Sequence, residues 1–114
     1  MHEYSLIEAL VGRVREEAER RGAIAVRCLS VRVGELSGVD PELFLSAYET
    51  FRQGTVCEGA RLSLRRVPAV WSCPACGREI ERGAPLRCPA CREPAQLGEG
   101  GDALTLDSID MEVP

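Results

Sequence analysis

Two pairs of cysteines restrict what this chain can fold into more than any other feature. Cys73 and Cys76 are separated by Pro-Ala, and Cys88 and Cys91 are separated by the same two residues. This spacing lets both thiolates of a pair reach one metal ion at about 2.3 Å, because the backbone folds around the sulfur atoms. Four cysteines fill the coordination shell of zinc and leave no position for water. The pattern therefore predicts a structural zinc ribbon and argues against a zinc hydrolase.

Two further cysteines lie outside this pattern. Cys28 falls in an apolar phase of a predicted strand, so we expect it to be buried, whereas Cys57, close to Gly59, is expected to be more accessible. A cysteine nucleophile needs a nearby base, and the single histidine, His2, is far away in the sequence. We therefore expect no enzyme. Paired C-x-x-C units are typical of metal binding in a reducing compartment, which predicts a cytoplasmic protein.

The composition is that of a folded domain and excludes two classes of partner. The chain has 114 residues, of which 45% are hydrophobic and 28% are charged, and its net charge is −4. A nucleic-acid-binding protein needs the opposite sign of charge, so no nucleic acid is expected. The sequence contains no long apolar run, so no membrane is expected either. The oligomeric state stays open between monomer and homodimer.

Hydrophobic periodicity predicts two helices and three strands. Residues 5–21 form the first helix, with Ser5 and Glu8 as a capping box, and Asp40 caps a second helix that ends before Gly54. The expected strands cover residues 23–33, 60–67 and 103–113, and a change of apolar phase near Cys28 indicates a bulge. A strand, a helix and a strand in succession permit a right-handed parallel crossover, so we expect a mixed sheet.

The predicted fold is α+β: two helices on a three-stranded mixed sheet, with an inserted zinc-ribbon domain that holds its metal by four cysteines. Residues 1–69 and 102–114 form the main domain, and residues 70–101 form the zinc-binding domain, which ends in a glycine-rich linker. We also expect Arg61, Arg65 and Arg66 to face the acidic residues of the last strand across the sheet. Trp71 is expected to pack on the cysteine knuckle, although an exposed anchor is the alternative.

The first residues suggest a second, different metal site. The α-amine of Met1 has a pKa of roughly 7.7 to 8.0 and lies one peptide from the imidazole of His2. Such a nitrogen-rich, planar donor set suits Ni(II) or Cu(II), and affinity alone does not decide between them. Glu3 adds an amide and a carboxylate. A histidine near a terminus is more often simply solvated, so these residues alone leave both interpretations open.

Taken together, these features resemble the HypA family of hydrogenase maturation factors. The resemblance rests on residues 1–6, residues 31–42, the two Cys-Pro-Ala-Cys pairs and residues 108–112. It implies a nickel metallochaperone with transient Ni(II) at Met1, His2 and Glu3, and structural Zn(II) at Cys73, Cys76, Cys88 and Cys91.

The resemblance also implies partners, namely the nickel GTPase HypB, the large subunit of [NiFe]-hydrogenase and, in some members, urease maturation proteins. The chain has no second histidine, so its fourth nickel donor is the Glu3 amide, a carboxylate, water or a side chain of a partner. The main alternative is a zinc-ribbon interaction module without nickel transport.

Overall fold

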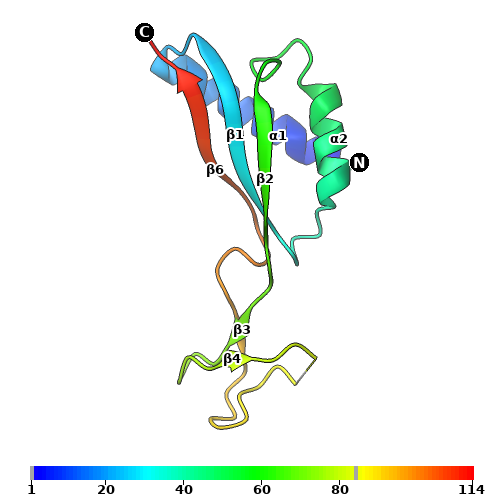
Figure 1. The fold of residues 1–114 in the computed structure, drawn as a ribbon, viewed down its shortest axis with the longest axis vertical. Coiled ribbons are helices and arrows are strands. Elements are labelled where there is room, and N and C mark those ends of the chain that lie inside the picture. The colour runs from blue at the N-terminus through cyan, green and yellow to red at the C-terminus, as the bar shows by residue number, and fades with distance from the viewer. Residues whose placement is uncertain (1, 84) are drawn as a thin grey trace.

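The chain folds into a helix-and-sheet body and a small module that carries the cysteine pairs (Figure 1). The computed structural model describes residues 2–83 and 85–114. The body contains α1 (His2–Arg21), β1 (Ala25–Gly34), α2 (Pro41–Phe51), β2 (Arg61–Val67) and β6 (Leu104–Glu112). The module, inserted between β2 and β6, contains β3 (Trp71–Ser72), β4 (Glu79–Ile80) and β5 (Gln96–Leu97). This arrangement confirms the predicted α+β fold.

The sheet of the body is mixed, as expected. Its strand order is β2-β1-β6, with β1 parallel to β2 and antiparallel to β6. The parallel pair is connected through α2, which is the predicted crossover. The register between β1 and β6 shifts between Val26 and Cys28 and again between Ser30 and Val31, which confirms the bulge near Cys28.

The expected charge pairing between β2 and the last strand is wrong, because β1 lies between them. β1 takes the central place because its side chains at Val26, Leu29, Val31 and Val33 are all buried, and a central strand is the most shielded from water. Two of the acids of β6 are paired with arginines of β1 instead. Arg27 donates to Glu112 and Arg32 donates to Asp107, each at 2.7 Å.

The first helix begins at His2, so the predicted capping box at Ser5 is wrong. The additional turn is held by contacts with α2 that the local sequence does not reveal. The carboxylate of Glu3 accepts from the backbone N–H of Asp40 at 3.5 Å, and the ring of Tyr4 meets Phe51 edge-on with centroids 5.2 Å apart. The helix ends where predicted, at Gly22, which has a φ of 62°.

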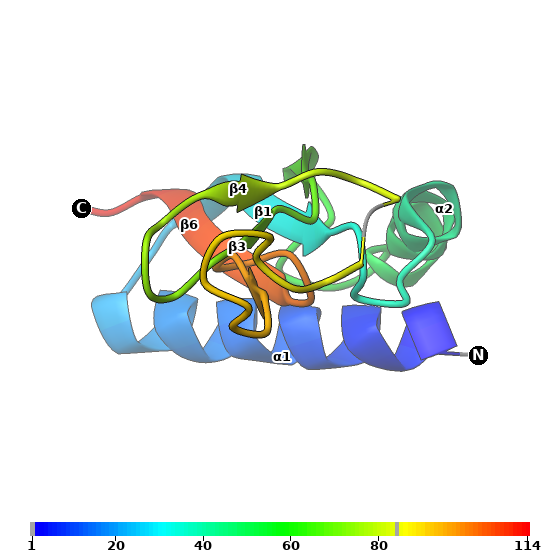
Figure 2. The ribbon, with the colours of Figure 1, turned by 90° about the horizontal axis from the view of Figure 1, so that it is seen from below.

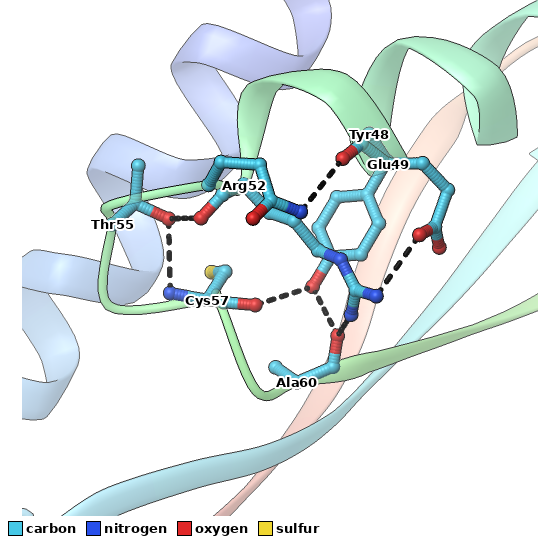
Figure 3. Close-up of polar contacts among 7 residues, drawn as sticks. Tyr48, Glu49, Arg52, Thr55, Cys57 and Ala60 are labelled. Carbon is cyan, nitrogen blue, oxygen red and sulfur yellow. Dashed lines mark hydrogen bonds and ion pairs between the residues drawn. The ribbon is translucent and has the colours of Figure 1, made fainter.

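The second helix and the loop after it are fixed by polar contacts. Asp40 caps the helix as predicted, accepting from the N–H groups of Glu42 at 3.0 Å and Leu43 at 3.3 Å. In the loop, the hydroxyl of Tyr48 donates to the carbonyl of Ala60 at 2.6 Å (Figure 3).

The positions of both isolated cysteines differ from expectation. Cys57 is fully buried in the loop after α2, and Cys28 is only partly buried. Burial raises the pKa of the Cys57 thiol above its ordinary value. Cys57 therefore acts as a small apolar side chain, which is the role that the sequence suggests for Cys28.

The body and the module each have a hydrophobic cluster of their own. α1 lies across one face of the sheet (Figure 2), and the body core gathers residues from both helices and all three strands, among them Ile7, Leu29, Phe44 and Ile109. The module has a cluster of its own, made of Cys73, Ile80 and Cys88. Within the described part of the chain, neither helix combines the length and hydrophobicity that a membrane crossing requires.

Candidate metal centres

The structure brings the four cysteines of the two pairs together at one point of the module. The sulfur atoms of Cys73, Cys76, Cys88 and Cys91 all lie within 4.8 Å of one another. Those of Cys76 and Cys88 are 3.8 Å apart. A tetrahedral ion with metal–sulfur bonds of about 2.3 Å requires sulfur atoms separated by about 3.8 Å. The cluster therefore has the dimensions of a four-thiolate site.

The two pairs are built as matching knuckles. In each, the residue after the second cysteine donates its N–H to the carbonyl of the first: Gly77 to Cys73 and Arg92 to Cys88, both at 2.8 Å. This turn requires a positive φ, which is 77° at Gly77 and 62° at Arg92. Glycine adopts this conformation at little cost, whereas arginine is strained in it.

The electrostatics of the cluster favour a bound cation. The N–H of Cys91, which lies 3.4 Å from the sulfur of Cys88, lowers the pKa of the Cys88 thiol to about 7. By contrast, the neighbouring sulfur atoms, that of Cys76 first, raise the pKa of Cys91 to about 12. The protein alone thus stabilises some thiolates at the expense of others. Four thiolates coexist only when a cation balances their charge, and soft sulfur donors in a tetrahedron fit Zn(II).

Short strands and one aromatic side chain support the knuckles. Trp71, in β3, pairs with Ile80 of β4 and with Leu97 of β5. Its side chain is partly buried and packs against the cluster of Cys73, Ile80 and Cys88. This confirms the expected packing of Trp71. Two of the three buried residues in that cluster are themselves cysteines, so the module has very little apolar core without its metal ligands.

The second candidate centre is at the beginning of α1. Met1 lies outside the described residues, and His2 is the first residue of the helix. The first four N–H groups of a helix have no partner within it, so the amides of His2 and Glu3 are not needed for the helical ladder. Glu3 is 9% exposed, and its carboxylate is directed at Asp40, the N-cap of α2. The side chain of Glu3 is therefore directed at the start of α2.

The sequence marks Glu3 as a candidate ligand and Asp40 as a helix cap, but it does not predict that the two residues are in contact. They are separated by 37 positions, and no local pattern relates them. The structure does not bring the two candidate centres together. The start of α1 lies beside α2 in the body, whereas the cysteines lie in the module beyond the lower end of the sheet (Figure 1).

Comparison with known proteins relates the whole chain to one family. The profile of the HypA family, described as "Hydrogenase/urease nickel incorporation, metallochaperone, hypA", matches residues 1–111. A curated relative from Nitrosospira multiformis, the hydrogenase maturation factor HypA, is 38% identical over 97% of both chains. The factor of the same name from Deinococcus radiodurans is 41% identical over 93% of this chain and 89% of its own.

Solved structures agree with this assignment. The solution structure of the Ni metallochaperone HypA from Helicobacter pylori superposes with a TM-score of 0.70, at 28% identity and 98% coverage of both chains. A second solution structure of a HypA protein superposes with a TM-score of 0.77, at 30% identity, over 100% of this chain and 98% of the other. The chain therefore belongs to the HypA family, whose members are nickel metallochaperones of hydrogenase maturation.

Proposed function

We propose that this chain carries Ni(II) at its N-terminus and delivers it to [NiFe]-hydrogenase during maturation. The observation that carries this proposal is the start of α1, where His2 and Glu3 offer amides that no helical hydrogen bond uses. With the α-amine of Met1 and the imidazole of His2, these amides make a planar set of nitrogen donors, which suits Ni(II). A nickel chaperone from Helicobacter pylori with the same fold supports the choice of metal.

The orientation of Glu3 narrows the choice of the fourth donor. Its carboxylate is held at the start of α2 by the N–H of Asp40, so we assign the Glu3 amide, rather than its side chain, to the nickel site. Deprotonated amides also offset the charge of the ion near the positive end of the helix dipole.

The proposal gives the cysteine cluster a structural role. Cys73, Cys76, Cys88 and Cys91 hold Zn(II), and their closed tetrahedron leaves no position for a reacting water. The protein is accordingly a carrier and not an enzyme. Thiolate ligands need a reducing compartment, so the proposal includes the cytoplasm as its location.

The partners follow from the family rather than from any surface of this chain. We propose the nickel GTPase HypB as the protein that works with it, and the large subunit of [NiFe]-hydrogenase as the acceptor. The family description also names urease, so urease maturation proteins are a further class of acceptor partner.

The test is a calorimetric titration of zinc-loaded protein with Ni(II). Three changes are compared with the native chain: His2→Ala, two residues added before Met1, and, as a matched control, Glu8→Gln on the exposed side of α1. The first two changes should abolish high-affinity uptake, and the control should not alter it. Equal uptake by all four proteins would contradict the proposed nickel site and favour the alternative function, a zinc-ribbon interaction module without nickel transport.

The pH dependence gives a second criterion. The amine, the imidazole and the amides must all lose protons before they bind the metal, so the affinity for Ni(II) should fall steeply as the pH falls. An affinity that does not change between about pH 8 and pH 6, where the amine and the imidazole titrate, would contradict the proposed ligands.

A further inference from the structure

One ion pair joins the cysteine module to the body. Glu35 lies in the turn after β1, and Arg82 lies in the turn after β4 of the module. The Nη1 group of Arg82 donates to Oε2 of Glu35 at 2.9 Å, and its Nη2 group contacts the other carboxylate oxygen, Oε1. Such a two-pronged contact fixes direction as well as distance. Between residues 70–101 and the remainder of the described chain, it is the single pair of opposite charges.

The pair is closed into a ring by the connecting segment. The N–H of Ala69 donates to Oε1 of Glu35 at 2.8 Å, and the Nη2 group of Arg82 donates to the carbonyl of Ala69 at 3.1 Å. Arg82 first, and the Ala69 amide second, lower the pKa of Glu35 to about 2. The carboxylate therefore stays charged throughout the physiological pH range.

Two segments connect the body with the module, one after β2 and one before β6, and both bind to the turn that follows β1. The N–H of Glu35 donates to the carbonyl of Val67 on the outgoing strand, and the N–H of Leu36 donates to the carbonyl of Gly101 on the returning segment, both at 2.8 Å. Gly34 lies so close to the backbone of Gly100 and Gly101 that a Cβ atom has no room there. Residues 34–36 thus form a pivot, and the module's turn at Arg82 reaches back to it.

We propose that the Arg82–Glu35 pair is a latch that fixes one orientation of the cysteine module about this pivot and opens without unfolding either part. The side chain of Arg82 is 64% exposed and that of Glu35 is 41% exposed, so water and other proteins reach both directly. Ion pairs that are this exposed break and re-form readily. The body and the module have separate hydrophobic clusters, so neither needs the latch for its own packing. The orientation, and not the stability, is what the pair controls.

Opening the latch also changes a surface of the module. Arg82 forms one wall of a cavity of about 540 Å³ whose other walls include Pro68, Val70, Trp71 and Ile80. When the guanidinium leaves Glu35, this apolar lining becomes more accessible. Trp71 is the sole tryptophan of the chain, so its fluorescence reports the change without any label.

The latch is tested in zinc-loaded full-length protein without nickel, which makes the result independent of the proposed carrier function. The variants are Arg82→Ala, Glu35→Gln and the exchanged pair Glu35→Arg with Arg82→Glu. The matched control is Arg78→Ala, because Arg78 is an exposed arginine of the same module that has no ion pair with any described residue. The measurements are the rotational correlation times of body and module amides from ¹⁵N relaxation, and quenching of Trp71 by acrylamide.

In the native chain and the control, body and module should share one correlation time. In both single variants this shared value should be lost, with faster motion of the module, stronger quenching of Trp71 and unchanged chemical shifts in the body away from residues 34–36. The exchanged pair re-forms the ion pair but not the two bonds to Ala69, because a guanidinium accepts no hydrogen bond and a carboxylate donates none, so it should restore part of the native behaviour. High salt should release the native module in the same way, which tests the latch without any substitution. Unchanged relaxation in Arg82→Ala and in high salt would show that the backbone pivot alone sets the orientation, and would overturn the proposal.

Discussion

At the scale of single residues, Tyr48 shows how one buried side chain closes a loop. Its hydroxyl reaches the carbonyl of Ala60, and Arg52 donates to the same carbonyl at 2.8 Å from above the ring (Figure 3). This arrangement draws the segment after α2 inward and buries Cys57 with it. The sequence predicted the buried side of α2 but not this loop, because its contacts depend on how the chain returns to β2.

Tyr48 should make the stability of the protein depend on pH in the alkaline range. Burial, as the largest cause, raises the pKa of Tyr48 well above its usual value of 10.0, so the folded state keeps a proton that the unfolded state loses. The free energy of unfolding should therefore fall as the pH rises above about 10. Denaturant unfolding of native protein and of Tyr48→Phe, followed from about pH 8 to pH 11, checks this expectation.

At neutral pH the native chain should be more stable than Tyr48→Phe by about 1 kcal/mol, because one hydrogen bond is lost. Arg52 still satisfies the carbonyl of Ala60, which keeps the loss small. The difference between the two proteins should shrink above about pH 10. A difference that is constant over the whole range would mean that the phenol ionises equally in both states.

At the scale of elements, the sequence identified the helices and strands of the body but not all of their neighbours, and it missed the three short strands of the module. Apolar alternation located β1 and its bulge, and Asp40 marked the start of α2, because both signals are local. The strand order is not encoded by neighbouring residues. Opposite charges on β2 and β6 suggested that these strands pair, but the more apolar β1 lies between them. The start of α1 was likewise set by its contacts with α2, through Glu3 and Tyr4.

Two glycines in different elements should respond oppositely to the same substitution. A Cβ at Gly34, at the end of β1, collides with the backbone of Gly100 and Gly101, so Gly34→Ala should destabilise the protein by about 1 to 3 kcal/mol. Gly12 lies within α1 with no atom close to its missing Cβ, so Gly12→Ala should stabilise the protein by about 0.5 to 1 kcal/mol.

Urea unfolding followed by the helical circular dichroism signal measures both changes, and Gly12→Ala serves as the control for the chemistry of the substitution. A midpoint for Gly34→Ala equal to that of the native chain would mean that the turn at Gly100 moves away without cost.

At the scale of the whole molecule, the sequence predicted two parts but not how they are joined. The four cysteines were recognisable from their spacing, because a metal-binding knuckle is encoded within a few consecutive residues. The latch between Glu35 and Arg82 spans 47 positions, and neither residue belongs to a motif that reveals the other. The relative position of body and module is therefore a property of the folded chain that spacing alone does not contain.

Removal of the metal should unfold the module and leave the body intact. The module's cluster consists of Cys73, Ile80 and Cys88, which is too small to fold without a cation, whereas the body core contains none of the four ligands. After treatment with a strong chelator, the fluorescence of Trp71 should change to that of an exposed indole while the helical signal is retained. Loss of both signals in parallel would show that the two parts fold as one unit.

The insertion of the module between β2 and β6 delays the completion of the sheet during synthesis. On the ribosome, β1 emerges early, but its antiparallel neighbour β6 is synthesised only after the module with all its cysteines. The sheet therefore stays incomplete until the whole module has been synthesised. A module folded around zinc would hold the end of β2 and the beginning of β6 close together, and so shorten the loop that must close before β6 pairs with β1.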